Sequence, residues 1–238
     1  MFTKNHFIII SISIILIIGA ILLSKKYKLS SKTATKIFFV ICIISELVKD
    51  FANIIPSKYG GYVLDPEDIP LHLCSIVVFG MLYLMLSKND KNKEHIKTAI
   101  VVLGVISPIF AILIPGEGVA FNKVITYQYF LYHDALFWYA GYHIISKQVT
   151  LGKKEYFLDL KYLGITIMMM LYLNSALSTY GVNYCFLRKP PVDGLIILNL
   201  NHGWVCYFII LVLIGIISVS IVHLPSIIKE KKLNNKLN

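Results

Sequence analysis

Long blocks without a charged residue dominate this sequence of 238 residues. Residues 7–23, 69–87 and 203–228 contain no Asp, Glu, Lys or Arg. A helix needs about 20 apolar residues to cross the hydrocarbon layer of a bilayer. The strands of a membrane β-barrel alternate apolar and polar side chains, whereas these blocks are apolar throughout. The sequence therefore predicts an all-α fold, a polytopic membrane helical bundle.

The apolar pattern predicts about seven transmembrane helices in one domain over residues 1–228. We expect the spans at residues 7–24, 34–55, 69–87, 97–115, 126–146, 158–179 and 203–224. The first block is interpreted as a retained span, because no small-residue cleavage site follows it. Residues 229–238 are expected to form a short basic cytoplasmic tail, either amphipathic or disordered.

The basic residues gather on one side of the predicted membrane. Seventeen of the 23 Lys and Arg residues fall in the tail or between spans one and two, three and four, or five and six. Because positively charged loops stay in the cytoplasm, this distribution predicts an outside N-terminus and a cytoplasmic C-terminus. The net charge of +10 then reflects topology and contact with anionic lipid, and we expect no nucleic-acid partner.

The remaining composition suggests the source of the chain and argues against a metal site or a cofactor. Its 22 lysines stand against a single arginine, as in proteins of AT-rich genomes, so we expect a bacterial plasma membrane protein. The four cysteines form no Cys-x-x-Cys pair, which argues against a zinc site. Cys185 and Cys206 both lie near the predicted outer face and could pair in a disulfide, although nothing in their spacing favours one.

Polar side chains concentrate at the outer ends of five predicted spans. In the second span, Glu46, Lys49, Asp50 and Asn53 recur with helical spacing on one face. The inner halves are expected to be almost purely aliphatic. Since unpaired polar groups are costly in hydrocarbon, we expect them to meet in one polar cavity that opens to the outside. Other polar side chains at this level are His72, Gln128, His133 and Asn174.

Several of these residues also have a purely structural interpretation. Glu46 and Asp50 can be satisfied by ion pairing within their own helix. His72 can snorkel at the membrane surface. Cys74 is by default a small buried hydrophobe, and Asn174 can hydrogen-bond a neighbouring helix.

His133 favours a site more strongly, whereas Arg188 gives a weaker hint. His133 is expected about two turns inside the fifth span, where a histidine without a function is poorly accommodated. Arg188 is the one arginine of the chain, which hints at bidentate binding of a phosphate or carboxylate. The alternative is that Arg188 and Lys189 are solvated loop charges.

Three motifs resemble those of a known family. Ile69–Ser75 resembles the Leu-Pro-Leu-His-Leu-Cys signature of the YwaF-type bacterial integral membrane proteins, and Tyr129–His133 resembles their aromatic segment ending in histidine. Residues Asn183–Pro191 resemble their Asn-Tyr-x-x-Leu-x-x-Lys-Pro-Pro loop. The resemblance covers roughly residues 30–225. It departs at Asn201–Trp204, which lacks the two prolines of the family's Trp-containing run.

The YwaF-type proteins are in turn distantly similar to a eukaryotic seven-span family of transmembrane phospholipid acyltransferases. That resemblance implies a cysteine nucleophile in a His-x-Cys motif, which here is Cys74 beside His72. It also implies membrane lipids as substrates.

The first functional hypothesis is therefore a Cys/His-dependent lipid acyltransferase or acyl hydrolase. Cys74 would be the nucleophile, and His133 the base, oriented by Asn174 or Gln128. His72 is the second candidate base, but it would face away from Cys74 if both were helical. The substrate-binding candidates are Asn174, Gln128, Asn183, Tyr184, Arg188, Lys189, Glu46 and Asp50.

Two alternatives remain open at the level of the sequence. The cavity could serve a small-solute or proton-coupled transporter, or a ligand-binding membrane protein, with Glu46, Asp50 and His133 relaying protons. An inner half without polar lining argues against a transport pathway. The chain could also be an accessory membrane subunit without catalytic activity.

Overall fold

The computed structural model describes residues 3–57, 61–116, 118–192 and 194–237. The ends of the predicted domain and tail, residues 1, 2 and 238, lie outside the described part. Within these ranges the chain forms seven α-helices. They are α1 (Lys4–Lys26), α2 (Ser31–Ala52), α3 (Val77–Leu86), α4 (Asp90–Leu113), α5 (Val124–Ile145), α6 (Lys153–Ala176) and α7 (Gly203–Leu237).

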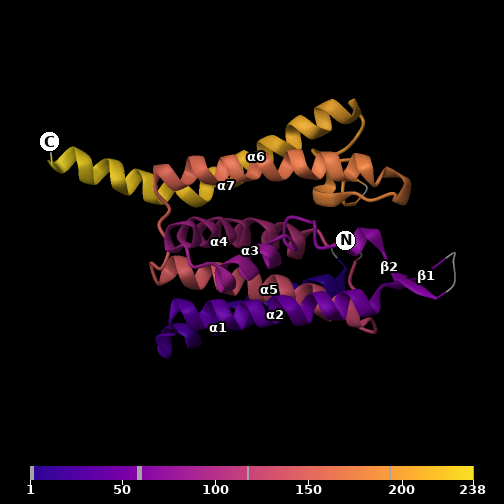
Figure 1. Cartoon of the computed structure of the whole chain (residues 1–238), viewed down its shortest axis with the longest axis horizontal. Coiled ribbons are helices and arrows are strands. Elements are labelled where there is room, and N and C mark those ends of the chain that lie inside the picture. The colour runs from indigo at the N-terminus through magenta and orange to yellow at the C-terminus, as the bar shows by residue number, and fades with distance from the viewer. Residues whose placement is uncertain (1–2, 58–60, 117, 193, 238) are drawn as a thin grey trace.

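The helices form two groups. The first five pack as one bundle, in which α5 contacts α1, α2 and α4, while α3 lies against α2 and α4. Helices α6 and α7 run side by side along this bundle and contact it mainly through α4 (Figure 1). The arrangement is therefore a five-helix bundle with an attached helix pair.

The surface of the helices identifies the surrounding solvent. Helices α1, α4 and α6, and residues Gly203–Lys232 of α7, are long and apolar enough to cross a membrane. Ile209, Leu213, Ile217 and Ile221 recur every four residues on α7 and are all at least half exposed. Because such a stripe is favourable against lipid and unfavourable against water, the chain is a helical membrane protein. Helices α2 and α5 have the length of a span but are not among these four candidates, and α3 has only ten residues.

The predicted third span is wrong in its first half. A 3₁₀ turn (Pro66–Asp68) and a non-helical segment precede α3, which begins only at Val77. Pro70 lacks a backbone donor and disfavours helix at the residue before it, and Ile69 accordingly has an extended ψ of 135°. Cys74 therefore lies in a turn just ahead of α3, where the Ile76 N–H donates to the His72 carbonyl at 2.9 Å.

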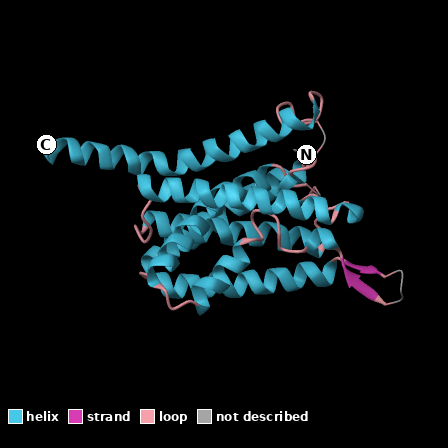
Figure 2. Cartoon of the chain, turned by 45° about the horizontal axis from the view of Figure 1, so that its top comes forward, coloured by secondary structure: helices cyan, strands magenta, loops and turns pink. Residues whose placement is uncertain are grey.

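A short β-hairpin also departs from the all-α prediction. Strands β1 (Ile54–Pro56) and β2 (Tyr62–Leu64) pair antiparallel with Ile55 opposite Val63. Branched side chains such as Ile54, Ile55 and Val63 favour extended backbone. The hairpin projects from one end of the bundle (Figure 2). We call this the hairpin end; it also holds residues 114–116, 118–123, 177–192 and 194–202. The opposite, lysine-rich end holds the other helix connections.

The predicted basic tail is helical through residue 237. Helix α7 continues from Gly203 through Pro225 to Leu237 and extends beyond the bundle at the lysine-rich end (Figure 1). The predicted seventh span ended at residue 224, so the chain remains helical about three turns longer than expected.

Aromatic packing holds the five-helix bundle together. Phe38 of α2 is fully buried and stacks on Tyr139 of α5, with ring centroids 4.9 Å apart. At the crossing of α4 and α5, a Cβ on Gly104 would lie 3.0 Å from the Ala140 Cβ and 3.2 Å from the Leu136 carbonyl. These distances are tighter than most Cβ contacts, so a larger residue would have to displace its neighbours. Small residues are a usual means of such close helix packing in membranes.

The lysine-rich end contains buried polar groups, contrary to the expected aliphatic inner halves. His223 of α7 lies 2.9 Å from the Asp159 carboxylate of α6. His143 of α5 lies 3.1 Å from the Ser31 hydroxyl of α2. Each polar group has a partner on the neighbouring helix, which is how polar side chains are tolerated in hydrocarbon.

Candidate functional site

A cavity of about 530 Å³ lies at the hairpin end, between the five-helix bundle, the α6–α7 pair and the loop after α6. This volume falls within the range of about 300–1,000 Å³ typical of ligand pockets. Its lining is mainly apolar, with a cluster of polar side chains at one side. These polar side chains include Glu67, His72, Cys74, Gln128 and His133.

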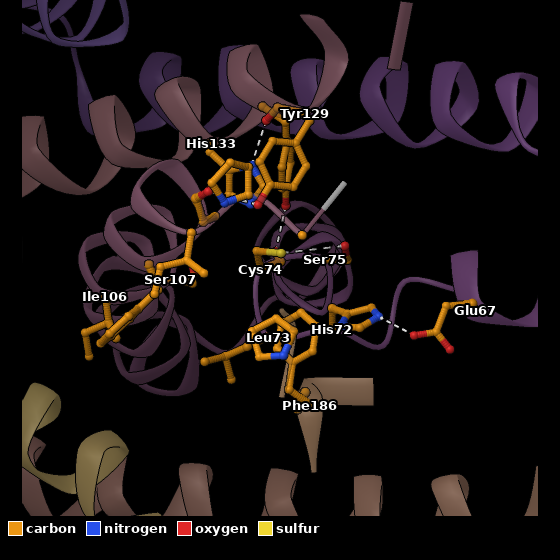
Figure 3. A pocket seen from close by; sticks show the side chains of 18 of the residues that line it. Glu67, His72, Leu73, Cys74, Ser75, Ile106, Ser107, Tyr129, His133 and Phe186 are labelled. Carbon is orange, nitrogen blue, oxygen red and sulfur yellow. Dashed lines mark hydrogen bonds and ion pairs between the residues drawn. The ribbon is translucent and has the colours of Figure 1, made fainter. Parts of the chain in front are cut away.

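Cys74 lies in the middle of the polar side of the cavity (Figure 3). The residue is partly exposed, and its thiol lies 4.0 Å from the Ser75 hydroxyl. The Tyr132 hydroxyl donates to the Cys74 carbonyl at 2.7 Å and so fastens the turn to α5. The backbone is thus held in place while the sulfur is left accessible, as a nucleophile requires.

His133 of α5 is buried and lines the same cavity. Its Nδ1 lies 2.6 Å from the Tyr129 carbonyl, and a carbonyl oxygen can only accept, so Nδ1 carries the proton. In the neutral imidazole, Nε2 is then the unprotonated acceptor. Among the described residues Nε2 has no hydrogen-bond partner, and the atom itself is almost fully buried. The histidine thus has an unpaired accepting nitrogen beside the cavity.

His72 belongs to a different hydrogen-bonded group. Its Nε2 lies 3.4 Å from the Glu67 carboxylate, and its ring packs near Tyr184 and Phe186. Burial raises the pKa of Glu67, but hydrogen bonds from His72 and from the Asn183 N–H at 2.8 Å more than offset it, leaving the pKa below its ordinary value. Neither His72 nor Cys74 lies in a helix, so helical spacing does not turn the His72 ring away from Cys74.

The loop after α6 is fixed by two asparagines. Asn174 donates to the Tyr184 carbonyl at 3.0 Å and accepts from the Tyr184 N–H at 2.8 Å. The Asn183 side chain accepts from the N–H groups of Arg188 and Lys189. We therefore interpret Asn174 and Asn183 as residues that shape the loop.

This loop brings a second cysteine to the cavity. Cys185 and Phe186 both have left-handed backbone conformations, with φ of 54° and 55°, which are strained for residues other than glycine. The Cys185 thiol lies 3.4 Å from the Leu71 carbonyl. Burial raises the pKa of this thiol to about 12, so it is protonated at neutral pH and is a weak nucleophile.

The structure gathers four of the predicted site residues and leaves the others outside the cavity. Cys74, His72, His133 and Gln128 line it, although Gln128 is occupied by a 2.7 Å hydrogen bond to the Ser45 hydroxyl. The Arg188 guanidinium donates to the Val182 carbonyl at 2.9 Å instead of facing the cavity. The predicted residues outside the cavity lining are Glu46, Asp50, Asn174, Asn183, Tyr184, Arg188 and Lys189.

Sequence reasoning missed the apolar part of the cavity. This part is lined by α4, α6 and α7, and includes Leu211, Gly215 and Ser218 on one face of α7. The sequence feature that could have indicated this part is the pair of small residues Gly215 and Ser218. They lie three residues apart, on one face of an otherwise bulky aliphatic helix.

Comparisons with known proteins agree with this architecture. The chain matches the TMEM164 family, a family of transmembrane proteins, over residues 1–223. No curated protein and no solved structure matches it. Because the match spans nearly the whole chain, this membrane protein belongs to the TMEM164 family.

Proposed function

We propose that the protein is a Cys/His-dependent lipid acyltransferase or acyl hydrolase. In this proposal the chain crosses a bacterial plasma membrane about seven times, and the third crossing consists of the ten-residue α3 and the non-helical segment before it. The N-terminus lies outside and the lysine-rich end lies in the cytoplasm. The observation that carries the proposal is the shared cavity, in which the accessible Cys74 thiol and the unoccupied Nε2 of His133 accompany an apolar lining. The resemblance to phospholipid acyltransferases, with its His-x-Cys motif, supports the same assignment.

The first half of the reaction is attack on a lipid ester. The Cys74 sulfur bonds to the acyl carbonyl carbon, and its proton passes to Nε2 of His133. The ester C–O bond then breaks, and His133 returns the proton to the departing glycerol oxygen. The products are a thioester on Cys74 and a lysolipid.

The second half removes the acyl group. A hydroxyl of a second lipid, or water, gives its proton to His133 and attacks the thioester, and the thiol is regenerated when the C–S bond breaks. An ester supplies the acyl group and an ester or acid is formed, so the cycle needs no cofactor. Cys74 and His133 are not hydrogen-bonded to each other in the free protein, and catalytic hydrogen bonds often tighten only when substrate is bound.

His72 is the competing base in this scheme. His72 is two residues before Cys74 in the chain, and its ring is paired with Glu67. The His133 ring, in contrast, is held through Nδ1, and its accepting Nε2 has no partner among the described residues. This difference favours His133 as the base. The His72–Glu67 pair then has the role of fixing the segment before α3 at the cavity.

The experiment uses purified protein in phospholipid nanodiscs with an acyl-labelled lipid. The wild type should transfer or release label and accumulate a hydroxylamine-sensitive adduct on Cys74, detected by peptide mass spectrometry. Cys74→Ala should abolish the adduct, and His133→Ala should slow turnover by roughly 10²–10⁴-fold, the usual contribution of a general base. Cys206→Ala, at an exposed cysteine outside the cavity lining, is the matched control and should retain activity.

Two results would reject the proposal. Full activity in both Cys74→Ala and His133→Ala would remove these residues from the chemistry. No turnover by the wild type, together with identical whole-cell lipid profiles for wild type and Cys74→Ala, would favour a ligand-binding or transport protein instead.

A further inference from the structure

The apolar part of the cavity has a different character from the part around Cys74. It extends between α4, α6 and α7, and we call it the apolar branch. Its lining is represented by Ile106, Phe110, Leu163, Ile167, Leu211 and Gly215. Aliphatic and aromatic side chains with no charged group among these residues suit a hydrocarbon ligand.

The branch also reaches deep into the bilayer region. Leu163 belongs to its lining, and from Leu163 to the end of α6 at Ala176 the helix rises roughly 20 Å at about 1.5 Å per residue. Cys74, in contrast, lies in the turn ahead of α3 at the hairpin end. A linear ligand held at Cys74 therefore has an apolar channel that leads away from the thiol toward the membrane interior.

Gly215 keeps the deep part of this channel open. A Cβ placed on Gly215 would lie 3.4 Å from the Leu163 side chain, which is ordinary contact and not a clash. Glycine is thus not required here for close helix packing, unlike Gly104. A larger side chain at this position must either displace Leu163 or project into the cavity that Gly215 lines.

We infer that the apolar branch binds one fatty acyl chain of the lipid substrate, and that Gly215 and Leu163 limit the chain length it accepts. This inference rests on the proposed function, because it places the reacting carbonyl at Cys74. The acyl chain then lies along α6 and α7 with its methyl end near Gly215.

The catalytic test compares acyl chain lengths in variants that alter the branch in opposite directions. Gly215→Leu fills its deep end, and Leu163→Ala enlarges it. We expect Gly215→Leu to lower the rate with a hexadecanoyl lipid relative to a decanoyl lipid by about tenfold or more, since even one methylene in an apolar pocket gives roughly tenfold discrimination. Leu163→Ala should shift the preference toward longer chains.

The matched control is Gly164→Leu on α6. Gly164 neighbours Leu163 in sequence, yet a Cβ there meets no atom within 4 Å and the residue is outside the cavity lining. Gly164→Leu should keep the wild-type chain preference. An unchanged preference in both Gly215→Leu and Leu163→Ala would overturn the inference even if Cys74 is the nucleophile.

A binding measurement separates this inference from the proposed chemistry. Purified Cys74→Ala protein in nanodiscs is irradiated with a phosphatidylcholine that carries a diazirine near the methyl end of one chain. Crosslinks should appear on cavity-facing residues of α6 and α7 such as Ile167 and Leu211, and Gly215→Leu should reduce them relative to Gly164→Leu. Crosslinks confined to the lipid-exposed surface, unaffected by Gly215→Leu, would show annular lipid only and would reject the branch as an acyl site. Neither result requires turnover.

Discussion

The five-helix bundle and the α6–α7 pair differ in the extent of their buried packing, although both contain polar contacts between helices, such as His143 with Ser31 in the bundle. In the bundle, buried aromatic and aliphatic side chains such as Phe38, Met81 and Tyr139 interlock across α2, α3, α4 and α5. In the pair, hydrogen bonds between polar groups are prominent at both ends. At the lysine-rich end Asp159 lies against His223, and at the hairpin end Asn174 fastens the loop through Tyr184.

This difference has a consequence for the cavity, which lies at the junction of the two groups. The bundle supplies His133 and the α5 contact that fixes Cys74. The pair supplies the apolar branch and contacts the bundle mainly through α4. Under the proposed function, close aromatic packing would hold Cys74 and His133 in place, and the side connected by fewer contacts would separate to admit a lipid chain.

The largest expected effect is the loss of aromatic packing in the bundle. Phe38→Ala removes a fully buried ring stacked on Tyr139. We expect the free energy of unfolding in mixed SDS and maltoside micelles to fall by about 3 kcal/mol, the lower end for such truncations, because lipid solvates an apolar ring better than water does. The control Phe157→Ala, on a ring of α6 that is 58% exposed, should change stability little. Equal effects of the two variants would contradict the comparison.

The sequence predicted the helices well because their signal is local. Long apolar blocks are sufficient to locate the apolar cores of α1, α4, α6 and α7, whatever their neighbours. The helix ends were predicted less well, since α4 begins seven residues earlier than expected and α7 ends 13 residues later. The start of α3 was missed because the apolar residues around Pro70 continue without a charge while the backbone is not helical. Apolar composition alone does not report that change.

The candidate site was predictable only in part. Cys74 and His133 could be singled out because polar residues are rare inside apolar blocks. Arg188 and Asn183 looked equally suitable, but their hydrogen bonds depend on how residues 182–189 fold back on themselves. The apolar branch depends on the packing of α6 and α7 against α4, which no single segment encodes.

A smaller effect is expected from breaking the polar contact that joins α6 to α7. Asp159→Leu would leave the buried His223 ring without the carboxylate at 2.9 Å. An unpaired buried polar group costs about 1–3 kcal/mol, so the free energy of unfolding should fall by about 2 kcal/mol. In the double variant Asp159→Leu with His223→Leu, the orphaned group is gone and most of the loss should be recovered. A double variant as unstable as the sum of the two single ones would show that the residues act independently.

The smallest expected effect is a pH dependence of stability that arises from Glu67, in the segment before α3. The carboxylate of Glu67 faces His72 and the Asn183 N–H, with Lys189 as a further positive charge, and its pKa in the folded protein lies below the ordinary value of 4.5. A group with a lowered pKa stabilises the folded state above its unfolded pKa, and that contribution disappears as the pH falls through the folded pKa. Its side chain is 41% exposed, so screening by solvent should limit the contribution to less than about 1 kcal/mol. The difference in stability between wild type and Glu67→Gln should therefore be small and constant near neutral pH, and should shrink on acidification below about pH 4.5. A difference that grows on acidification would mean that Glu67 is not stabilised as a carboxylate by the loop.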